Sequence, residues 1–311
     1  MRTIWVVVGS IATLLALRAP AAAAEAEGEK GGEQGEAPGD LAKAVQNPIA
    51  DLISVPFQNN TSYNIGPNQR ASNTLNIQPV IPVHLSDRIL LVTRTILPIT
   101  YQPDLTSTGG GTSGVSDLSS SFFLSPAKPG KIMWGVGPIV VLPTATQRAV
   151  GTGRWSAGPT AVALMQPGDW TFGVLVNQAW SFAGPANRAN VSAMTVQYFI
   201  NYNLPDAWYL SSSPILTFNW KASSSEEWVV PVGGGVGKIF KLGKLPLNGT
   251  VQGFYNIRPE DSQTIGHWQA RVQLAFLFPT AKPKSKPTEE DETHQQARCA
   301  PPAPSPATAM H

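Results

Sequence analysis

Residues 267–278 read HWQARVQLAFLF and show the clearest alternation in the chain. Every second residue is apolar from Trp268 onward, while the positions between them begin as polar residues. Successive side chains of a β-strand point to opposite faces, so the stretch predicts a strand with one apolar and one polar face. The apolar face consists of Trp268, Ala270, Val272, Leu274, Phe276 and Phe278, and the polar face begins with His267, Gln269, Arg271 and Gln273.

The same alternation recurs upstream. In 191–204 an apolar series from Met194 to Leu204 opposes Thr195, Gln197, Asn201 and Asn203. Short runs of β-forming residues separated by turn residues predict twelve strands, most of them long for a soluble domain. The expected strands are 52–64, 74–85, 88–102, 115–125, 131–143, 154–165, 170–182, 191–204, 208–220, 227–237, 245–257 and 267–278.

The connections between these strands alternate in length. Those after even-numbered strands are short, as in Ser86-Asp87, whereas those after odd-numbered strands are mostly longer, as in 103–114. Outer-membrane barrels combine an even strand number with short periplasmic turns and longer outside loops. The sequence therefore predicts an all-β fold, an antiparallel transmembrane β-barrel of about 12 strands with a short N-terminal helix. A half-buried soluble sheet would show the same alternation, so that alternative stays open.

Prolines inside the expected strands argue against a regular closed sheet, because proline cannot donate to the ladder. Either the barrel is bulged at several points, or some of the expected strand boundaries are wrong. The prolines concerned are Pro79, Pro82, Pro98, Pro138, Pro159, Pro214 and Pro231.

The chain ends differ in composition from this middle region. Residues 1–24 have the form of a signal peptide, with Arg2, an apolar run and a cleavage site near Ala24, although a retained membrane anchor is the alternative. Residues 25–39 form an acidic Gly/Glu-rich linker, and 40–51 predict a short helix capped by Asp40 at the periplasmic mouth. The barrel is expected over 52–279 and a disordered tail over 280–311.

A family likeness is carried by eight short stretches, 46–52, 57–60, 75–82, 93–98, 134–138, 142–146, 201–205 and 232–238. They resemble exported bacterial barrel "transporter" proteins related to the meta-pathway phenol-degradation family, whose members often carry the misleading label neuromedin U. The likeness covers roughly 41–279. It implies an outer-membrane barrel that takes up small compounds, aromatic ones among them, although such barrels usually end at their last strand and this chain continues.

Enzyme chemistry finds little support in the residues. Only His84 and His267 lie in the barrel region, and two scattered histidines with the single Cys299 in the tail make no zinc site. The glycines of 232–238 do not have phosphate-loop spacing and predict a bend or a close side-chain approach instead. We therefore expect no catalytic residues, no cofactor and no metal.

Residues 52–279 carry 14 basic and 9 acidic residues. Arg88, Arg94, Lys221 and Arg271 fall on or at the ends of strands and are candidates for lining and selecting within the lumen. Structural charges paired with acids are the alternative. Within 40–51, a tuck into the barrel would make a plug, with Leu41, Val45, Asn47 and Pro48 as its candidate residues.

The predicted function is an outer-membrane channel or transporter, porin-like, for small molecules such as aromatic or anionic compounds. An exported β-rich ligand-binding or structural protein without a pore is the alternative, and an outer-membrane hydrolase is a third. The expected partners are outer-membrane lipid, the barrel-assembly machinery and a small-molecule solute. The near-neutral charge gives no reason to expect nucleic acid.

Overall fold

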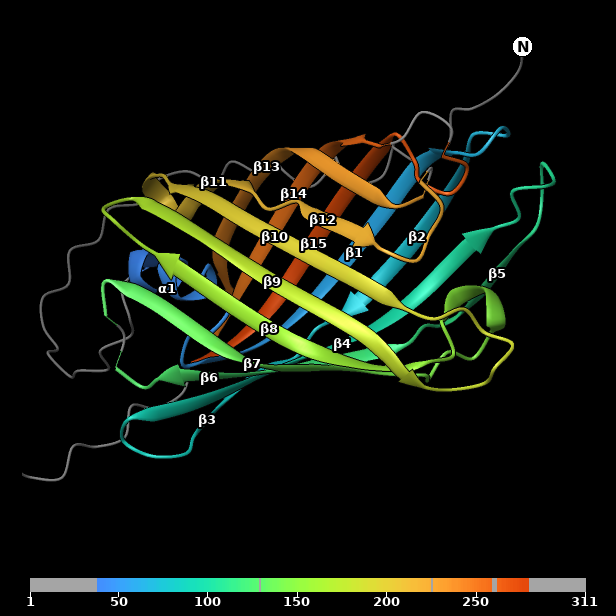
Figure 1. Ribbon diagram of the computed structural model, residues 1–311. Helices are drawn as coiled ribbons and strands as arrows, with labels where there is room; N and C mark the ends of the chain where they lie inside the picture. The colour runs from blue at the N-terminus through green and yellow to red at the C-terminus, as the bar shows by residue number, and fades with distance from the viewer. Residues whose placement is uncertain (1–37, 129, 225, 259–261, 280–311) are drawn as a thin grey trace, which may run out of the picture. The chain divides into compact units, whose positions relative to one another are not determined.

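The computed structural model describes residues 38–128, 130–224, 226–258 and 262–279 (Figure 1). The predicted signal peptide, most of the linker and the tail lie outside this part of the chain. Among the described residues no helix is long and apolar enough to cross a membrane. The strands are β1 Leu52–Ile65, β2 Arg70–Ile77, β3 Val80–His84, β4 Ile89–Pro103, β5 Gly111–Val115, β6 Leu118–Pro126, β7 Ile132–Leu142, β8 Trp155–Met165, β9 Trp170–Ala183, β10 Ser192–Asn203, β11 Trp208–Ser212, β12 Ile215–Asn219, β13 Trp228–Leu242, β14 Leu245–Ile257 and β15 Trp268–Pro279.

The sheet closes on itself as an antiparallel barrel. The path starts at β10, which pairs with both β11 and β12. It continues in the order β13, β14, β15, β1, β2, β4, β6, β7, β8 and β9, and β9 pairs with β10 to complete the ring. Three pairs of consecutive elements, β2 with β3, β5 with β6 and β11 with β12, are each one strand interrupted by two residues. Counted this way, the barrel has the twelve strands that the alternation predicts.

Proline explains two of the interruptions. Pro79 separates β2 from β3, and Pro214 separates β11 from β12. Pro138 of β7 stands directly opposite Pro159 of β8, so two residues that cannot donate to the ladder share one register position. The ladder is interrupted at both Pro79 and Pro214 without a shift in register, so these interruptions are not the expected bulges. The register shifts lie elsewhere, between Ser62 and Ile65 and between Trp155 and Ser156.

Connections at the two ends of the barrel differ in length, as predicted. One end carries only short links, among them Leu85–Arg88, Gln166–Asp169 and Gly243–Lys244, and we call it the short-turn end. The other, the long-loop end, carries Pro143–Arg154 and Gly184–Val191. The expected strands 52–64 and 74–85 leave a nine-residue connection, 65–73, but this prediction is wrong: Ile65 pairs with Arg70, which leaves only the turn Gly66–Gln69.

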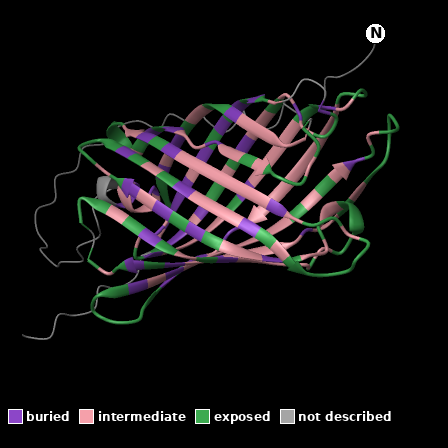
Figure 2. Ribbon diagram, in the orientation of Figure 1, coloured by how far each residue is buried: buried purple, intermediate pink, exposed green. Residues whose placement is uncertain are grey.

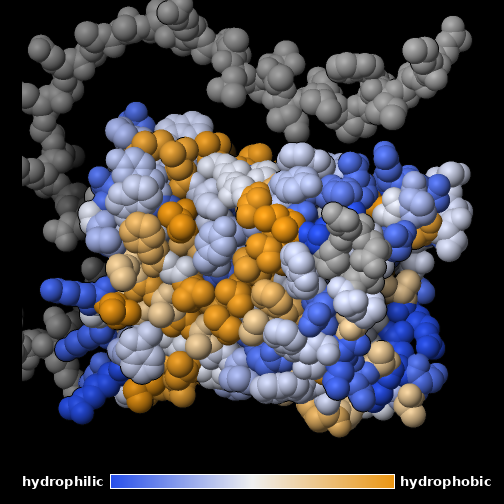
Figure 3. Space-filling view, turned by 45° about the horizontal axis from the view of Figure 1, so that its top comes forward, coloured by the Kyte–Doolittle hydropathy of each residue, from blue (hydrophilic) through white to orange (hydrophobic). Residues whose placement is uncertain are grey.

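Exposed and buried residues follow one another along the strands (Figure 2), and the face of the outer wall seen in Figure 3 is apolar across its middle. In the last strand Trp268, Val272, Leu274 and Phe278 are exposed, while Arg271 between them is 3% exposed. Figure 3 shows hydrophobic side chains gathered across the middle of the wall and hydrophilic ones toward both ends. Eight tryptophans lie at or near strand ends, Trp134, Trp170 and Trp208 at the short-turn end and Trp155, Trp180, Trp220, Trp228 and Trp268 at the long-loop end.

The helix α1, Pro38–Val45, lies inside the short-turn end of the barrel (Figure 1). It begins with proline, which suits the first helical position, and so starts two residues before Asp40 rather than being capped by it. Leu41 and Ala42 pack in a buried cluster with Tyr209, Ile239 and Leu277. The inward-facing residues that α1 covers are therefore apolar. In an open barrel the same positions would contact water.

Candidate solute pathway

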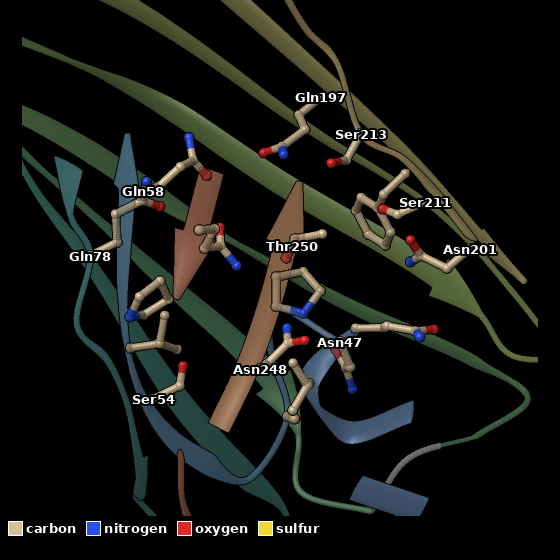
Figure 4. A pocket seen from close by; sticks show the side chains of 18 of the residues that line it. Asn47, Ser54, Gln58, Gln78, Gln197, Asn201, Ser211, Ser213, Asn248 and Thr250 are labelled. Atoms are coloured by element: carbon tan, nitrogen blue, oxygen red, sulfur yellow. The ribbon is translucent and has the colours of Figure 1, made fainter. Parts of the chain in front are cut away.

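The lumen above α1 holds a cavity of about 180 Å³, the lower chamber (Figure 4). Such a volume is smaller than the ~300–1,000 Å³ usual for drug-sized ligands. Inward-facing amides and hydroxyls converge on it because every second residue of each strand points into the barrel. Its polar wall includes Gln58, Gln78, Gln197, Asn201, Ser211, Ser213, Asn248, Thr250, Gln252 and Gln273.

Two arginines stand among these neutral groups. The Nη2 of Arg94 donates to Gln78 Oε1 at 2.8 Å. The Nε of Arg271 donates to Asn60 Oδ1 at 2.8 Å, and its Nη1 donates to the Ser213 carbonyl at 2.6 Å. No carboxylate lines this chamber in the described part of the chain. Both guanidinium groups are therefore hydrogen-bonded without being neutralised.

Arg271 also lines a second cavity, the upper chamber, of about 380 Å³ toward the long-loop end. Its guanidinium carbon lies 5.0 Å from the centre of the Phe254 ring, within the range of a cation–π contact. The walls of the upper chamber include Asn60, Thr74 and Asn256 and, among the described residues, no acid. Arg271 thus stands where the two chambers meet.

The floor of the lower chamber is the segment that follows α1. Gln46 fixes it to the barrel wall: its Nε2 donates to Asn203 Oδ1 at 2.7 Å, and its Oε1 accepts from Thr171 Oγ1 at 2.7 Å. Ile49 packs in a buried cluster with Val92 and Phe123 on the wall. The segment is thus held by an amide bridge and by an apolar anchor.

The predicted plug residues all lie in this region. Leu41 packs in the helix cluster, whereas Val45, Asn47 and Pro48 line the lower chamber. Asn47 Oδ1 also accepts from the backbone amide of Ile49 at 3.0 Å, which shapes the turn after the helix. The structure accordingly places 41–51 within the barrel at its short-turn end.

Of the four basic candidates, the structure brings only Arg94 and Arg271 into the lumen. Arg88 lies exposed in the turn between β3 and β4, and Lys221 lies exposed in the connection after β12. Both stand beyond the strands, where alternation no longer fixes the direction of a side chain. Their expected place in the lumen wall is therefore corrected.

The two histidines lie at opposite ends of the barrel. His84 Nε2 is 3.2 Å from Asp51 Oδ2, so it links β3 to the plug segment. His267 Nε2 is 2.6 Å from Arg258 Nη2 at the long-loop end. Within the described residues no group of His, Cys, Asp and Glu is arranged to hold a metal ion.

The sequence pattern did not indicate several residues that build the site. Gln46 and Ile49 hold the plug segment, and Phe254 supports Arg271. The inward positions Ala275 and Leu277 carried a usable signal, because the last strand is apolar on both faces there. Two apolar faces at one strand end indicate that something apolar occupies the interior.

The long-loop end is braced by Glu226. Its carboxylate accepts hydrogen bonds from the Ser262 hydroxyl and from the backbone amides of Gln263 and Thr264. Partial burial acts to raise the pKa of Glu226, but the hydrogen bonds, led by that of the Thr264 side chain, hold the pKa below its ordinary value. The connections 220–227 and 258–267 are thereby fastened together.

Comparison with known proteins bears on the fold. No protein-family model matches the chain, and no curated protein matches its sequence. Among solved structures, the COG4313 outer membrane channel from Pseudomonas putida F1 aligns over 73% of this chain and 94% of its own, with a TM-score of 0.56 and 16% identity. The likeness shows a shared barrel fold.

Two other barrels align less well. The CymD monoaromatic hydrocarbon channel covers 77% of this chain and 90% of its own, at 10% identity and a TM-score of 0.38. Outer membrane phospholipase A from Escherichia coli covers 74% of this chain and 97% of its own, at 14% identity and a TM-score of 0.37.

Proposed function

We propose that this protein is a bacterial outer-membrane channel for small anionic solutes, aromatic carboxylates among them. The observation that carries the proposal is the pair Arg94 and Arg271, which face the chambers with no acid beside them in the described lining. A guanidinium group binds carboxylate in a forked geometry and stacks on aromatic rings. The buried ring of Phe254 lies against Arg271 and supports it at the junction.

The apolar wall supports the membrane location. Charged side chains at the bilayer midplane cost about 2–4 kcal/mol, and the central wall presents residues such as Val236, Val251 and Val272 instead. In this proposal the short-turn end faces the periplasm and the long-loop end faces outward, and export uses a signal peptide cleaved near Ala24. The likeness to a known outer membrane channel agrees with this reading. Recovery of the protein from the periplasm without detergent would favour the soluble alternative.

We propose a channel rather than a hydrolase because the described histidines serve as braces. His84 is engaged with Asp51, and His267 with Arg258. A triad also requires a nucleophile hydrogen-bonded to the histidine, and among the described residues the side-chain hydrogen bonds and ion pairs of His84 and His267 go to Asp51 and Arg258 and to no hydroxyl or thiol. Ester hydrolysis by the purified protein that is lost in His84→Ala would contradict this choice.

The test is reconstitution of the purified full-length protein in planar bilayers. Under a salt gradient the reversal potential reports the preference for anions. An anion-selective current that benzoate carries or blocks supports the proposal. Cation preference, or no current from the correctly folded protein or from a variant without the plug segment, would overturn it.

A further inference from the structure

Three arginines crowd the long-loop end, on the connections Pro143–Arg154 and Gly184–Val191. Arg148 Nη2 donates to the Asn187 carbonyl at 3.1 Å, Arg154 Nη2 to the Arg188 carbonyl at 2.5 Å, and Arg188 Nε to the Thr152 carbonyl at 2.7 Å. Arginines of each connection donate to carbonyls of the other. They bring three guanidinium groups into one place, which we call the arginine cluster.

Opposite charge is scarce around this cluster. Every hydrogen bond that its guanidinium groups make within the described residues goes to a backbone carbonyl. The facing acid is Asp117, whose carboxylate accepts instead from the Ala145 amide and from the amide and hydroxyl of Thr152. The three guanidinium groups thus have one nearby acid, and the hydrogen bonds of that acid come from uncharged donors.

A comparable brace elsewhere on the same end lacks this excess. Arg70 donates to the carbonyls of Ser107 and Gly110 at 2.8 and 2.7 Å. Asp104 lies beside it as a single matching acid, and Arg70 adds to the hydrogen bonds of Thr106 and Ser107 in lowering the pKa of that carboxyl. Bracing a loop therefore does not require an uncompensated cluster.

Exposed aromatic side chains lie next to the cluster along the chain and the sheet. Trp155 follows Arg154 directly and is 41% exposed, and Trp180 and Phe182 at the end of β9 are 50% and 67% exposed. The pairing of Trp155 with Ala183 and of Ala157 with Trp180 places all three at one part of the rim. Apolar wall and cationic loops thus adjoin over the strands β8 and β9.

We propose that this region binds a phosphorylated lipid of the surrounding leaflet, with the phosphate on the arginine cluster and the acyl chains against Trp155, Trp180 and Phe182. Arginine recognises phosphate through charge-assisted, forked hydrogen bonds. Exposed aromatic rings at the rim supply the apolar part of an amphiphilic site. The inference rests on the membrane location proposed above and is independent of the solute that the lumen carries.

The experiment measures lipid binding to the purified full-length protein in detergent by native mass spectrometry. The probes are diphosphorylated lipid A, the same lipid without its phosphates, and inorganic phosphate. The proposal predicts that the diphosphorylated lipid binds at least about tenfold more tightly than the dephosphorylated one. Arg148→Gln, which removes one exposed charge and a single hydrogen bond, is expected to lower that affinity severalfold, and Phe182→Ser is expected to lower it too.

Matched controls separate the outcomes. Arg70→Gln removes a loop brace from a compensated site and leaves lipid affinity unchanged, whereas Arg148→Lys retains the charge and much of the binding. Equal losses in Arg70→Gln and Arg148→Gln would overturn the specific site. Equal binding of the phosphorylated and dephosphorylated lipids, or inorganic phosphate binding as tightly as the lipid, would overturn it as well. Failure of the protein to insert into lipid bilayers would instead count against the proposed membrane function.

Discussion

Two halves of the barrel interior differ in chemistry: the half around the chambers and the half around α1 at the short-turn end. The inward faces of the same strands line both. Along the inward face of β15, Arg271 and Gln273 line the lower chamber, while Ala275 and Leu277 pack in the helix cluster. On β10 the ring of Phe199, which is buried with Ile49, lies between the polar inward residues Gln197 and Asn201. On β15 the change from polar to apolar residues marks the level at which α1 fills the barrel.

The two kinds of interior agree with the proposed channel, which would need both a passage and a fixed plug. A water-filled passage needs polar walls, because unpaired polar groups are costly away from water. A fixed plug needs apolar contacts, since burying a leucine or isoleucine side chain contributes about 1.5–3 kcal/mol. The plug segment obtains these contacts through Leu41 and Ile49.

Removing the plug should change the conductance of the channel more than any other variant changes it. Deletion of residues 38–50 should raise single-channel conductance by roughly an order of magnitude, because these residues form the floor of the lower chamber. Planar-bilayer recording measures the change. Deletion of 25–36, which leaves α1 intact, is the matched control and should leave conductance near its starting value. An unchanged current in the folded 38–50 deletion would show that solutes do not pass through this floor.

Selectivity should change next most strongly. Arg94→Gln and Arg271→Gln each remove a lumen charge while retaining polar size, and we expect the anion-to-cation permeability ratio to fall severalfold in each. Reversal potentials under a salt gradient measure this ratio. Lys221→Gln removes an exposed charge outside the lumen and serves as the control. A ratio that falls equally in the control would place selectivity in the general charge of the protein.

The sequence predicts much of this architecture. The alternation in 267–278 and 191–204 correctly separates outer from inner residues, because the two-residue period of a strand leaves no other choice. It also identified Arg94 and Arg271 as inward-facing. Arg88 and Lys221 were misplaced because they stand in turns, where no period applies.

The site was less predictable than the fold. Which inward side chains meet in one chamber depends on strand register, and the register follows from long-range pairings such as Asn60 with Arg271. The bridge from Gln46 to Thr171 joins residues 125 positions apart in the chain. Local pattern contains no information on such contacts.

Acid should loosen the long-loop end more than the plug. Folding lowers the pKa of Glu226. The stabilisation from the hydrogen bonds that its carboxylate accepts is therefore fully present above the ordinary pKa near 4.5, and it is lost as the pH falls through the lower pKa of the folded state. Amide exchange at Thr264 is therefore expected to rise severalfold at low pH, whereas the neutral bridge through Gln46 does not titrate. Glu226→Gln at pH 7 should reproduce the acid effect. If the Thr264 amide exchanges as slowly in Glu226→Gln as in the unmutated protein, the Glu226 carboxylate does not hold this connection in place.

The smallest effect is expected at Tyr209, which lies on the boundary between the two halves. Its ring packs with Leu41 in the helix cluster, and its hydroxyl donates to Asn248 Oδ1 at 2.7 Å on the polar side. Tyr209→Phe keeps the ring and leaves a buried acceptor without its donor, a change that costs about 1–3 kcal/mol. Conductance should barely move, because the plug contacts remain. Urea unfolding in lipid measures the loss, and Tyr209→Phe combined with Asn248→Leu should recover part of it, since removing both partners leaves no orphaned acceptor. A double variant that is less stable by the full sum of the two single changes would show that the hydroxyl and the amide do not act as a pair.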